Sequence, residues 1–328
     1  MQGMETPAII AGAILLLTVL WDAFETMVLP RSAGTDLRLT RFFFVSTWLF
    51  WRFLSTRLSY KNPIRQAMLG IYGPLSLILL ITLWSNLLIL SFGLLLFGVG
   101  SSEATRLQIE SGGFGDYLYL SGVTLFTLGY GDETPGVPLT KALCVLEAGV
   151  GFGILAMVIG YLPALYQTFA RRETMVLRLY ARTGHPATSH KLVEKYGAVG
   201  AWKSLETVLS EWENWGAELL ESHRSYPILS FYRSQTEEDS WLATAVILCD
   251  VYDVIEEQCP ENALDRGALL LQAEATRNII ADGLSDLVNI LNLKGEQAPA
   301  MKLSRYLLLA LPPGLPACVK DTADTSVE

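Results

Sequence analysis

The sequence predicts an all-α membrane protein with three membrane-spanning helices, one segment that enters the bilayer without crossing it, and an α-helical domain outside the bilayer. Three observations predict this class. Hydrophobic residues make up 51% of the 328 residues and charged residues only 17%, against roughly 25% charged in a soluble domain. Three long runs carry almost no charge, and the second half of the chain repeats apolar residues at helical spacing.

The three apolar runs cover residues 8–29, 71–99 and 142–169. A bilayer core of about 30 Å is crossed by roughly 20 residues of helix. Each run is therefore long enough to be a transmembrane helix.

The connection between the first two runs is basic. Its single acid is Asp36, and its seven basic residues are Arg31, Arg38, Arg41, Arg52, Arg57, Lys61 and Arg65. The positive-inside rule makes this connection cytoplasmic, which places the amino terminus outside and the carboxy terminus in the cytoplasm, with the protein in the plasma (inner) membrane. Residues 42–54 are apolar and aromatic but too short to span comfortably, so we expect a helix that lies in the interface.

Two acids, Asp22 and Glu25, share one face of the first run near its cytoplasmic end. Acids within a membrane are candidates for functional sites, but arginines of the following connection are close enough in sequence to pair with them. We favour structural ion pairs.

The second half of the chain predicts a soluble helical domain. Leu205, Leu209 and Trp212 follow one another at spacings of three and four with acids between them. Residues 1–172 hold 11 basic and 10 acidic residues and the remainder 13 and 23, so the surplus of acid lies beyond the membrane runs and argues against nucleic-acid binding. Tail prolines argue against further helix; they are Pro312, Pro313 and Pro316.

These patterns divide the chain into four parts. Residues 1–66 hold the first transmembrane helix and the interfacial helix, and residues 67–172 the module of outer helix, re-entrant segment and inner helix. Residues 173–311 form the helical cytoplasmic domain, and residues 312–328 form a flexible tail.

The segment between the second and third runs joins a short apolar stretch to a glycine-rich motif. Residues 117–126 make a helix of about 15 Å, half a membrane, so the chain dips in and returns. The hexapeptide Thr-Leu-Gly-Tyr-Gly-Asp follows at 127–132. Irregular backbone at this depth is tolerated where it is buried in protein or lines a watery cavity, and glycine permits unusual backbone angles. A glycine-rich turn without function is the alternative.

This order of segments, over roughly residues 71–172, resembles the potassium-channel pore, with its re-entrant pore loop between an outer and an inner helix. The resemblance implies a filter that coordinates potassium through the Thr127 hydroxyl and backbone carbonyls, its residues being Thr127, Leu128, Gly129, Tyr130 and Gly131. It also implies that Asp132 braces the outer mouth. Phe126 and Val123 depart from the family pattern at bracing positions, which leaves open how the filter is braced and whether it inactivates.

The inner helix carries further candidates. Gly151 and Gly160 have a spacing from the filter similar to that of gating positions in related channels, and Pro163 should kink the helix. Close helix packing is the alternative reading of the glycines. Glu147 lies two to three turns into this helix, where an acid needs a partner; it either supports the short helix before the filter or binds an ion, and we favour support.

The sequence therefore predicts a potassium-selective channel. One chain holds one filter segment and a filter needs four, so we expect a homotetramer in a lipid bilayer. We expect no cofactor besides potassium ions in the filter, no other metal, and no enzyme activity, because no nucleophile, base or metal group is spaced for catalysis. A nonconducting membrane sensor and a nonselective cation channel are the alternatives, and a regulatory ligand of the cytoplasmic domain stays open.

Overall fold

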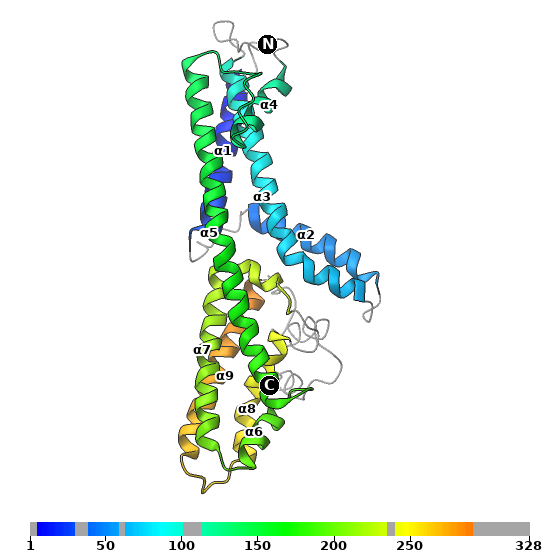
Figure 1. Ribbon diagram of the computed structural model, residues 1–328, viewed down its shortest axis with the longest axis vertical. Coiled ribbons are helices and arrows are strands. Elements are labelled where there is room, and N and C mark those ends of the chain that lie inside the picture. The colour runs from blue at the N-terminus through cyan, green and yellow to red at the C-terminus, as the bar shows by residue number, and fades with distance from the viewer. Residues whose placement is uncertain (1–4, 30–38, 59–62, 101–112, 235–239, 291–328) are drawn as a thin grey trace, which may run out of the picture. The chain divides into compact units, whose positions relative to one another are not determined.

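The computed structural model describes residues 5–29, 39–58, 63–100, 113–234 and 240–290 (Figure 1). Its helices are α1 (Glu5–Met27), α2 (Leu39–Thr56), α3 (Pro63–Gly100), α4 (Phe114–Leu125), α5 (Pro138–Thr183), α6 (Ser189–Gly197), α7 (Trp202–Ser225), the 3-10 helix η1 (Pro227–Phe231), α8 (Trp241–Gln258) and α9 (Arg266–Ile290). The predicted tail, with its prolines, lies outside the described residues.

The predicted fold class is confirmed. The described residues form helices and no strands, and α1, α3 and α5 are long and apolar enough to cross a membrane. The predicted interfacial segment is α2, and the short apolar stretch before the glycine-rich motif is α4. Both α3 and α5 extend beyond the apolar runs into the polar residues that flank them.

The chain forms two compact units. The first contains residues up to Arg65 and from Pro74 to Ala164, and the second contains Gln66–Gly73 and everything from Leu165 onward. The division inside α5 precedes the boundary after Arg172 that the charge pattern predicted, because the end of α5 packs with the second unit.

The first unit is built on close contact between α1 and α3. A Cβ at Gly12 would lie 2.8 Å from the Ser91 carbonyl oxygen, so glycine is what allows the two backbones to approach. The Ser91 hydroxyl uses this closeness to donate a hydrogen bond of 2.9 Å to the Gly12 carbonyl. Trp84 and Phe92 of α3 are fully buried in the same core.

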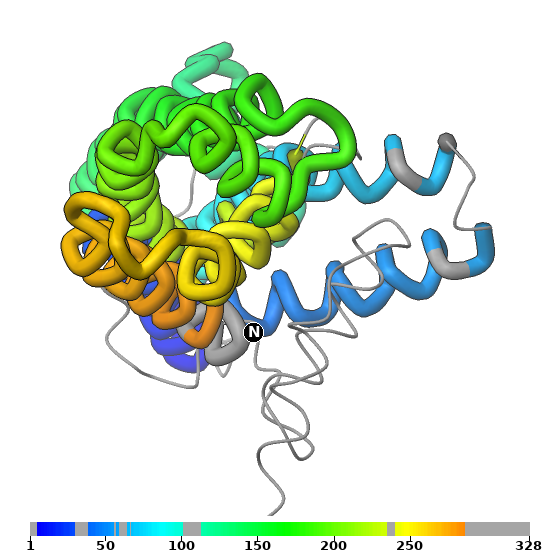
Figure 2. The backbone as a smooth tube through the Cα atoms, turned by 90° about the horizontal axis from the view of Figure 1, so that it is seen from below, coloured from blue at the N-terminus to red at the C-terminus, as the bar shows by residue number. Residues whose placement is uncertain are grey.

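The second unit is a helical bundle, and Figure 2 looks along its helices. Leu205, Leu209 and Trp212 of α7 are buried in its core, as their helical spacing predicted. A Cβ at Gly216 would lie within 3 Å of side-chain atoms of Ile279 and Ile280, so α7 and α9 pack tightly. The end of α5 contributes to this core through its own buried residues, Val176, Leu179 and Tyr180.

Candidate functional site

The glycine-rich motif begins where α4 ends. The N–H of Phe126 donates to the Gly122 carbonyl at 3.1 Å, and the N–H of Leu128 donates to the Val123 carbonyl at 2.8 Å. These bonds close the last turn of the helix and reverse the chain. The Val123 side chain is buried and the Phe126 side chain is 56% exposed. Within one chain, both residues contact the motif or its approach through backbone hydrogen bonds.

Along the motif, the backbone φ angle alternates between positive and negative values. The φ angles of Thr127, Gly129 and Gly131 are 54°, 59° and 78°, while Leu128 and Tyr130 between them keep negative φ. A positive φ is uncommon for a β-branched residue such as threonine and marks a strained position. This alternation in the sign of φ places successive backbone groups of one kind on one side of the chain. Carbonyl oxygens arranged in this way are ligands for a cation.

The motif is exposed in a single chain. All residues from 126 to 132 are exposed, and the exposed fractions of Leu128 and Tyr130 are 52% and 67%. The most apolar stretch of α5 is only 11% buried, against 39% for α3. One chain therefore supplies one side of a site and leaves a long apolar helix face uncovered.

Asp132 is held by a residue that the sequence analysis did not single out. The Tyr119 hydroxyl of α4 donates a hydrogen bond of 2.7 Å to Asp132 Oδ2, and the Glu133 N–H donates to Oδ1 at 3.1 Å. The hydrogen bond raises the pKa of Tyr119 to about 12 and holds the pKa of Asp132 below its ordinary value. The carboxylate thus ties the end of the motif to α4. The signal in the sequence was a hydrogen-bonding aromatic residue on the short helix before the motif.

Glu147 of α5 contacts α4. The Ser121 hydroxyl lies within hydrogen-bond distance of both Glu147 Oε1 and the Ile89 carbonyl oxygen, so Ser121 links α4 to α3 and α5. Glu147 is fully buried, and its Oε2 atom has no hydrogen-bond partner among the described residues. Glu147 therefore contacts α4 through Ser121, and its supporting role stays a prediction.

The two glycines of α5 differ in surroundings. A Cβ at Gly151 would collide with the Leu125 carbonyl oxygen at the end of α4, whereas nothing lies within 4 Å of the corresponding position at Gly160. Gly151 therefore has a packing reason to be glycine that does not require a hinge. Gly160 has none in the single chain, and Pro163 lies beside the division between the two units.

Asp22 is held by Thr40 and Trp84 among the described residues, and its predicted ion pair stays a prediction because Arg31 and Arg38 lie outside those residues. It accepts hydrogen bonds from the Thr40 N–H at 3.1 Å, the Thr40 hydroxyl at 2.6 Å and the Trp84 indole N–H at 2.9 Å. A carboxylate at the start of α2 satisfies free backbone N–H groups and complements the helix dipole. Asp22 thus joins α1, α2 and α3. Glu25 is also buried, and its role stays a prediction.

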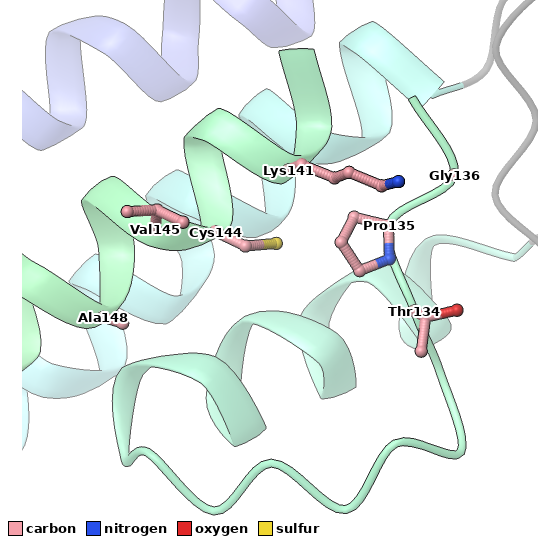
Figure 3. A pocket seen from close by; sticks show the side chains of 7 residues that line it. All are labelled: Thr134, Pro135, Gly136, Lys141, Cys144, Val145 and Ala148. Carbon is pink, nitrogen blue, oxygen red and sulfur yellow. The ribbon is translucent and has the colours of Figure 1, made fainter. Parts of the chain in front are cut away.

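A cavity of about 590 Å³ lies beside the glycine-rich motif, between the loop that follows the motif and the start of α5 (Figure 3). Its lining residues are Thr134, Pro135, Gly136, Lys141, Cys144, Val145 and Ala148. Val145 is 74% exposed, so the cavity opens on the uncovered face of α5. It is a feature of the surface and not an enclosed chamber for a ligand.

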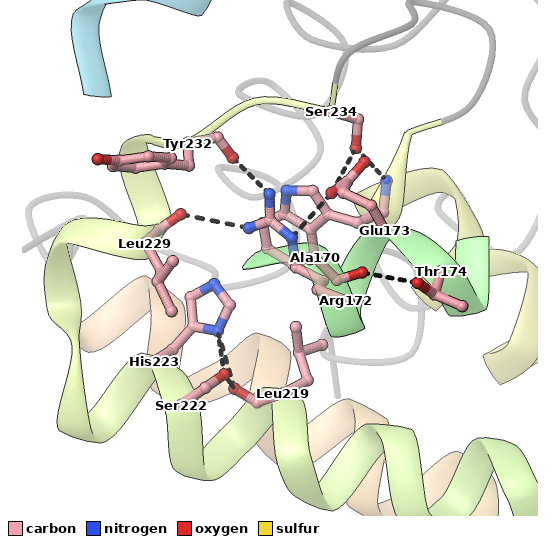
Figure 4. Close-up of polar contacts among 11 residues, drawn as sticks. Ala170, Arg172, Glu173, Thr174, Leu219, Ser222, His223, Leu229, Tyr232 and Ser234 are labelled. Carbon is pink, nitrogen blue, oxygen red and sulfur yellow. Dashed lines mark hydrogen bonds and ion pairs between the residues drawn. The ribbon is translucent and has the colours of Figure 1, made fainter. Parts of the chain in front are cut away.

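A buried arginine joins the end of α5 to the connection between α7 and α8 (Figure 4). Arg172 donates to the carbonyls of Leu229 at 3.3 Å and Tyr232 at 2.7 Å, and pairs with Glu173 at 3.0 Å. Its guanidinium lies 4.8 Å from the centroid of the Trp241 ring. Arg172 is 4% exposed and is the centre of a polar cluster.

The start of α3 reaches the same connection. The rings of Tyr72 and Phe231 meet edge to face with centroids 5.5 Å apart. A Cβ at Gly73 would lie 2.7 Å from the Tyr232 ring, so glycine allows this close approach. The residues of η1 and Tyr232 therefore contact both long helices within the second unit.

Comparison with known proteins agrees with this geometry. Residues 77–167, from α3 through α4 and the motif to α5, match the family described as ion channel. This segment is an ion-channel pore, as its sequence predicted, and the protein is an ion channel in a membrane.

The whole chain also has a relative. The uncharacterized membrane protein YdjJ of Bacillus subtilis (strain 168) is 24% identical over 325 residues, which cover 99% of this chain and 90% of the relative. The similarity therefore extends beyond residues 77–167 into the second half of the chain. No solved structure matches the chain.

Proposed function

We propose that the protein is a potassium-selective channel that conducts passively through a filter formed by residues 127–131. The observation that carries the proposal is the alternating backbone of Thr127, Gly129 and Gly131 directly after α4, within the segment that matches ion channels. Rings of backbone carbonyls replace the hydration shell of potassium in such filters. Potassium ions in the filter would be the only bound cofactor.

Selectivity is tested with the purified protein in liposomes that hold opposed potassium and sodium gradients. The reversal potential should follow potassium. Gly129→Ala should abolish the flux because alanine is strained at φ 59°, while Gly115→Ala, in open space on α4, should leave it unchanged. Equal permeability to both ions would indicate a nonselective cation channel. An intact assembly without flux would indicate a nonconducting sensor.

The proposed channel is a homotetramer. The exposed filter backbone and the uncovered apolar face of α5 both support assembly of several copies, and a filter of this kind uses four loops around one axis. Native mass measurement in detergent should give four chains per particle. A functional dimer would contradict the proposal.

The cytoplasmic domain is the proposed regulator of the inner helix, with the amino terminus outside and the carboxy terminus in the cytoplasm. The supporting observation is that the end of α5 is itself part of the domain's core. Truncation should therefore follow Thr183, the end of α5, and should leave a selective tetramer. A coupling of about 1 to 3 kcal/mol would change the open-to-closed ratio by roughly 5- to 150-fold. Unchanged open probability in intact truncated tetramers would limit the domain to assembly.

A further inference from the structure

The connection between α7 and α8 lies against one end of each of the long helices α3 and α5. We call residues 227–234 the clasp; they comprise η1 and the three residues that follow it. The Phe231 ring meets the Tyr72 ring of α3 edge to face, with centroids 5.5 Å apart. The Tyr232 ring lies against the Phe169 ring of α5, with centroids 5.8 Å apart. Two neighbouring residues of the clasp therefore contact both helices within the second unit.

Two residues at these contacts are unfavourable for the helices that carry them. Gly73 lies inside α3, where glycine is less stable than alanine, but a Cβ there would lie 2.7 Å from the Tyr232 ring. Arg172 of α5 is 4% exposed and donates to the Leu229 and Tyr232 carbonyls at 3.3 and 2.7 Å (Figure 4). A buried guanidinium is unfavourable unless such bonds compensate it. An alanine and an apolar side chain would fill the two positions more favourably, so the contacts are more specific than packing requires.

Both helices continue from the clasp into the pore. The helix α3 runs without a break from Pro63 to Gly100, and α5 runs from Pro138 to Thr183. Residues 66–73 and the end of α5 belong to the second unit, whereas the following part of α3 and the preceding part of α5 belong to the first. A helix transmits a displacement of its end more directly than a flexible linker does. The clasp is thus placed to link the movement of α5 to that of α3.

We propose that the clasp couples the end of α5 to the start of α3, and that the second unit alters the open probability of the channel by forming or releasing this link. When the link is formed, both helix ends are held to one short segment and move together. When it is released, α5 moves independently of α3. The link changes gating because its two states differ in energy between the open and the closed pore. The effect on the current rests on the proposed function, and the link itself does not.

A second route from the second unit to the pore runs through α5 alone. Val176 and Leu179 of α5 lie in the core of that unit, so movement of the bundle reaches α5 without the clasp. This route does not involve α3. A substitution on α3 that disturbs only the clasp therefore distinguishes the two routes.

Gly73→Ala is such a substitution, and Gly70→Ala is its matched control. At Gly73 the added methyl group displaces the Tyr232 ring, whereas at Gly70, about one turn earlier in the same helix, nothing lies within 4 Å of a Cβ. Hydrogen exchange is measured on the full chain in its native assembly. Gly73→Ala should lower protection about fivefold or more in peptides covering 226–234 and also in those covering 165–173. Gly70→Ala should keep the wild-type protection in both.

A second variant, Tyr232→Ala, tests whether the effect passes through the ring. Without the ring, the methyl group at position 73 no longer meets the side chain that it displaces in the wild-type background. Gly73→Ala should therefore add no further loss of protection to Tyr232→Ala, because the two substitutions act on one contact.

Single-channel recording of the same variants measures the effect on gating. Gly73→Ala should shift the open-to-closed ratio about fivefold or more, in the same direction as truncation after Thr183, with an unchanged reversal potential. Gly70→Ala should keep the wild-type ratio.

The proposal is overturned if the loss of protection in Gly73→Ala stops at the clasp and does not reach α5, because the two helices would then not be linked. It is also overturned if protection falls in both places while the open probability stays at its wild-type value. A wild type that carries no current defeats the proposed function instead, and hydrogen exchange alone then decides whether the link exists.

Discussion

Lowering the pH should loosen the second unit through His223. This residue of α7 is 2% exposed, and its Nδ1 atom lies 2.8 Å from the Leu219 carbonyl oxygen. A carbonyl only accepts, so Nδ1 carries the proton and Nε2, which has no hydrogen-bond partner among the described residues, is bare in the neutral ring. Burial, aided by the charge of Arg172, lowers the pKa of His223 to about 3.

The size of the effect follows from proton linkage. A histidine in the unfolded chain has a pKa of about 6.5, so between pH 6.5 and pH 3 the unfolded state binds more protons than the folded state. Stability contributed by neutral His223 is therefore present above pH 6.5 and is lost as the pH falls. At pH 5.0 the loss relative to pH 7.5 is about 2 kcal/mol, or about thirtyfold in the opening equilibrium.

Hydrogen exchange of the intact protein measures this opening. Peptides covering 219–232 should lose about thirtyfold in protection between pH 7.5 and pH 5.0, after correction for the intrinsic pH dependence of exchange. In His223→Asn the side-chain amide can still donate to the Leu219 carbonyl but does not titrate. This variant should be less stable overall and flat across the same pH range. An equal pH dependence in both proteins would refute the assignment to His223.

Three further predictions concern the first unit. Tyr119→Phe removes the hydrogen bond that lowers the pKa of Asp132, so the pH at which acid on the outer side reduces the potassium current should shift upward; an unchanged midpoint would separate Tyr119 from the filter. Gly151→Ala forces a methyl group against the Leu125 carbonyl and should cost about 1 to 3 kcal/mol in thermal unfolding, whereas Gly153→Ala, in open space, should cost far less. Asp22→Ala leaves the Trp84 indole N–H without its acceptor and should destabilise the fold by about 1 to 3 kcal/mol, read from the same thermal scans.

Local patterns predicted well what local chemistry decides. The membrane runs became α1, α3 and α5, and the hexapeptide adopted an unusual backbone because Gly129 and Gly131 tolerate positive φ. The periodic residues of α7 became core because helical spacing places them on one face. None of these inferences depended on which distant segment would pack nearby.

Contacts between distant segments could not be predicted in the same way. Ser121 and Glu147 are 26 residues apart, and Asp22 and Trp84 are 62 apart, so only the folded chain shows that they meet. Local patterns likewise could not show that Asp22 accepts hydrogen bonds from the first turn of α2, where the backbone N–H groups lack helical partners. The burial of Arg172 could not be predicted either, because its partners come from the remote connection at 229–232.

Both α3 and α5 contain a proline close to the point where the chain passes from one unit to the other. The division of the chain falls directly before Pro74 in α3 and one residue after Pro163 in α5. A proline removes one hydrogen bond of a helix and is a common site of kinks. On the second-unit side, η1 and Tyr232 contact both helices, so the two helix ends are held to one body. Gly151, by contrast, is packed against Leu125. If the second unit moves α5, we expect the bend near Gly160 and Pro163, because that stretch combines a missing hydrogen bond with open space around the glycine among the described residues of one chain.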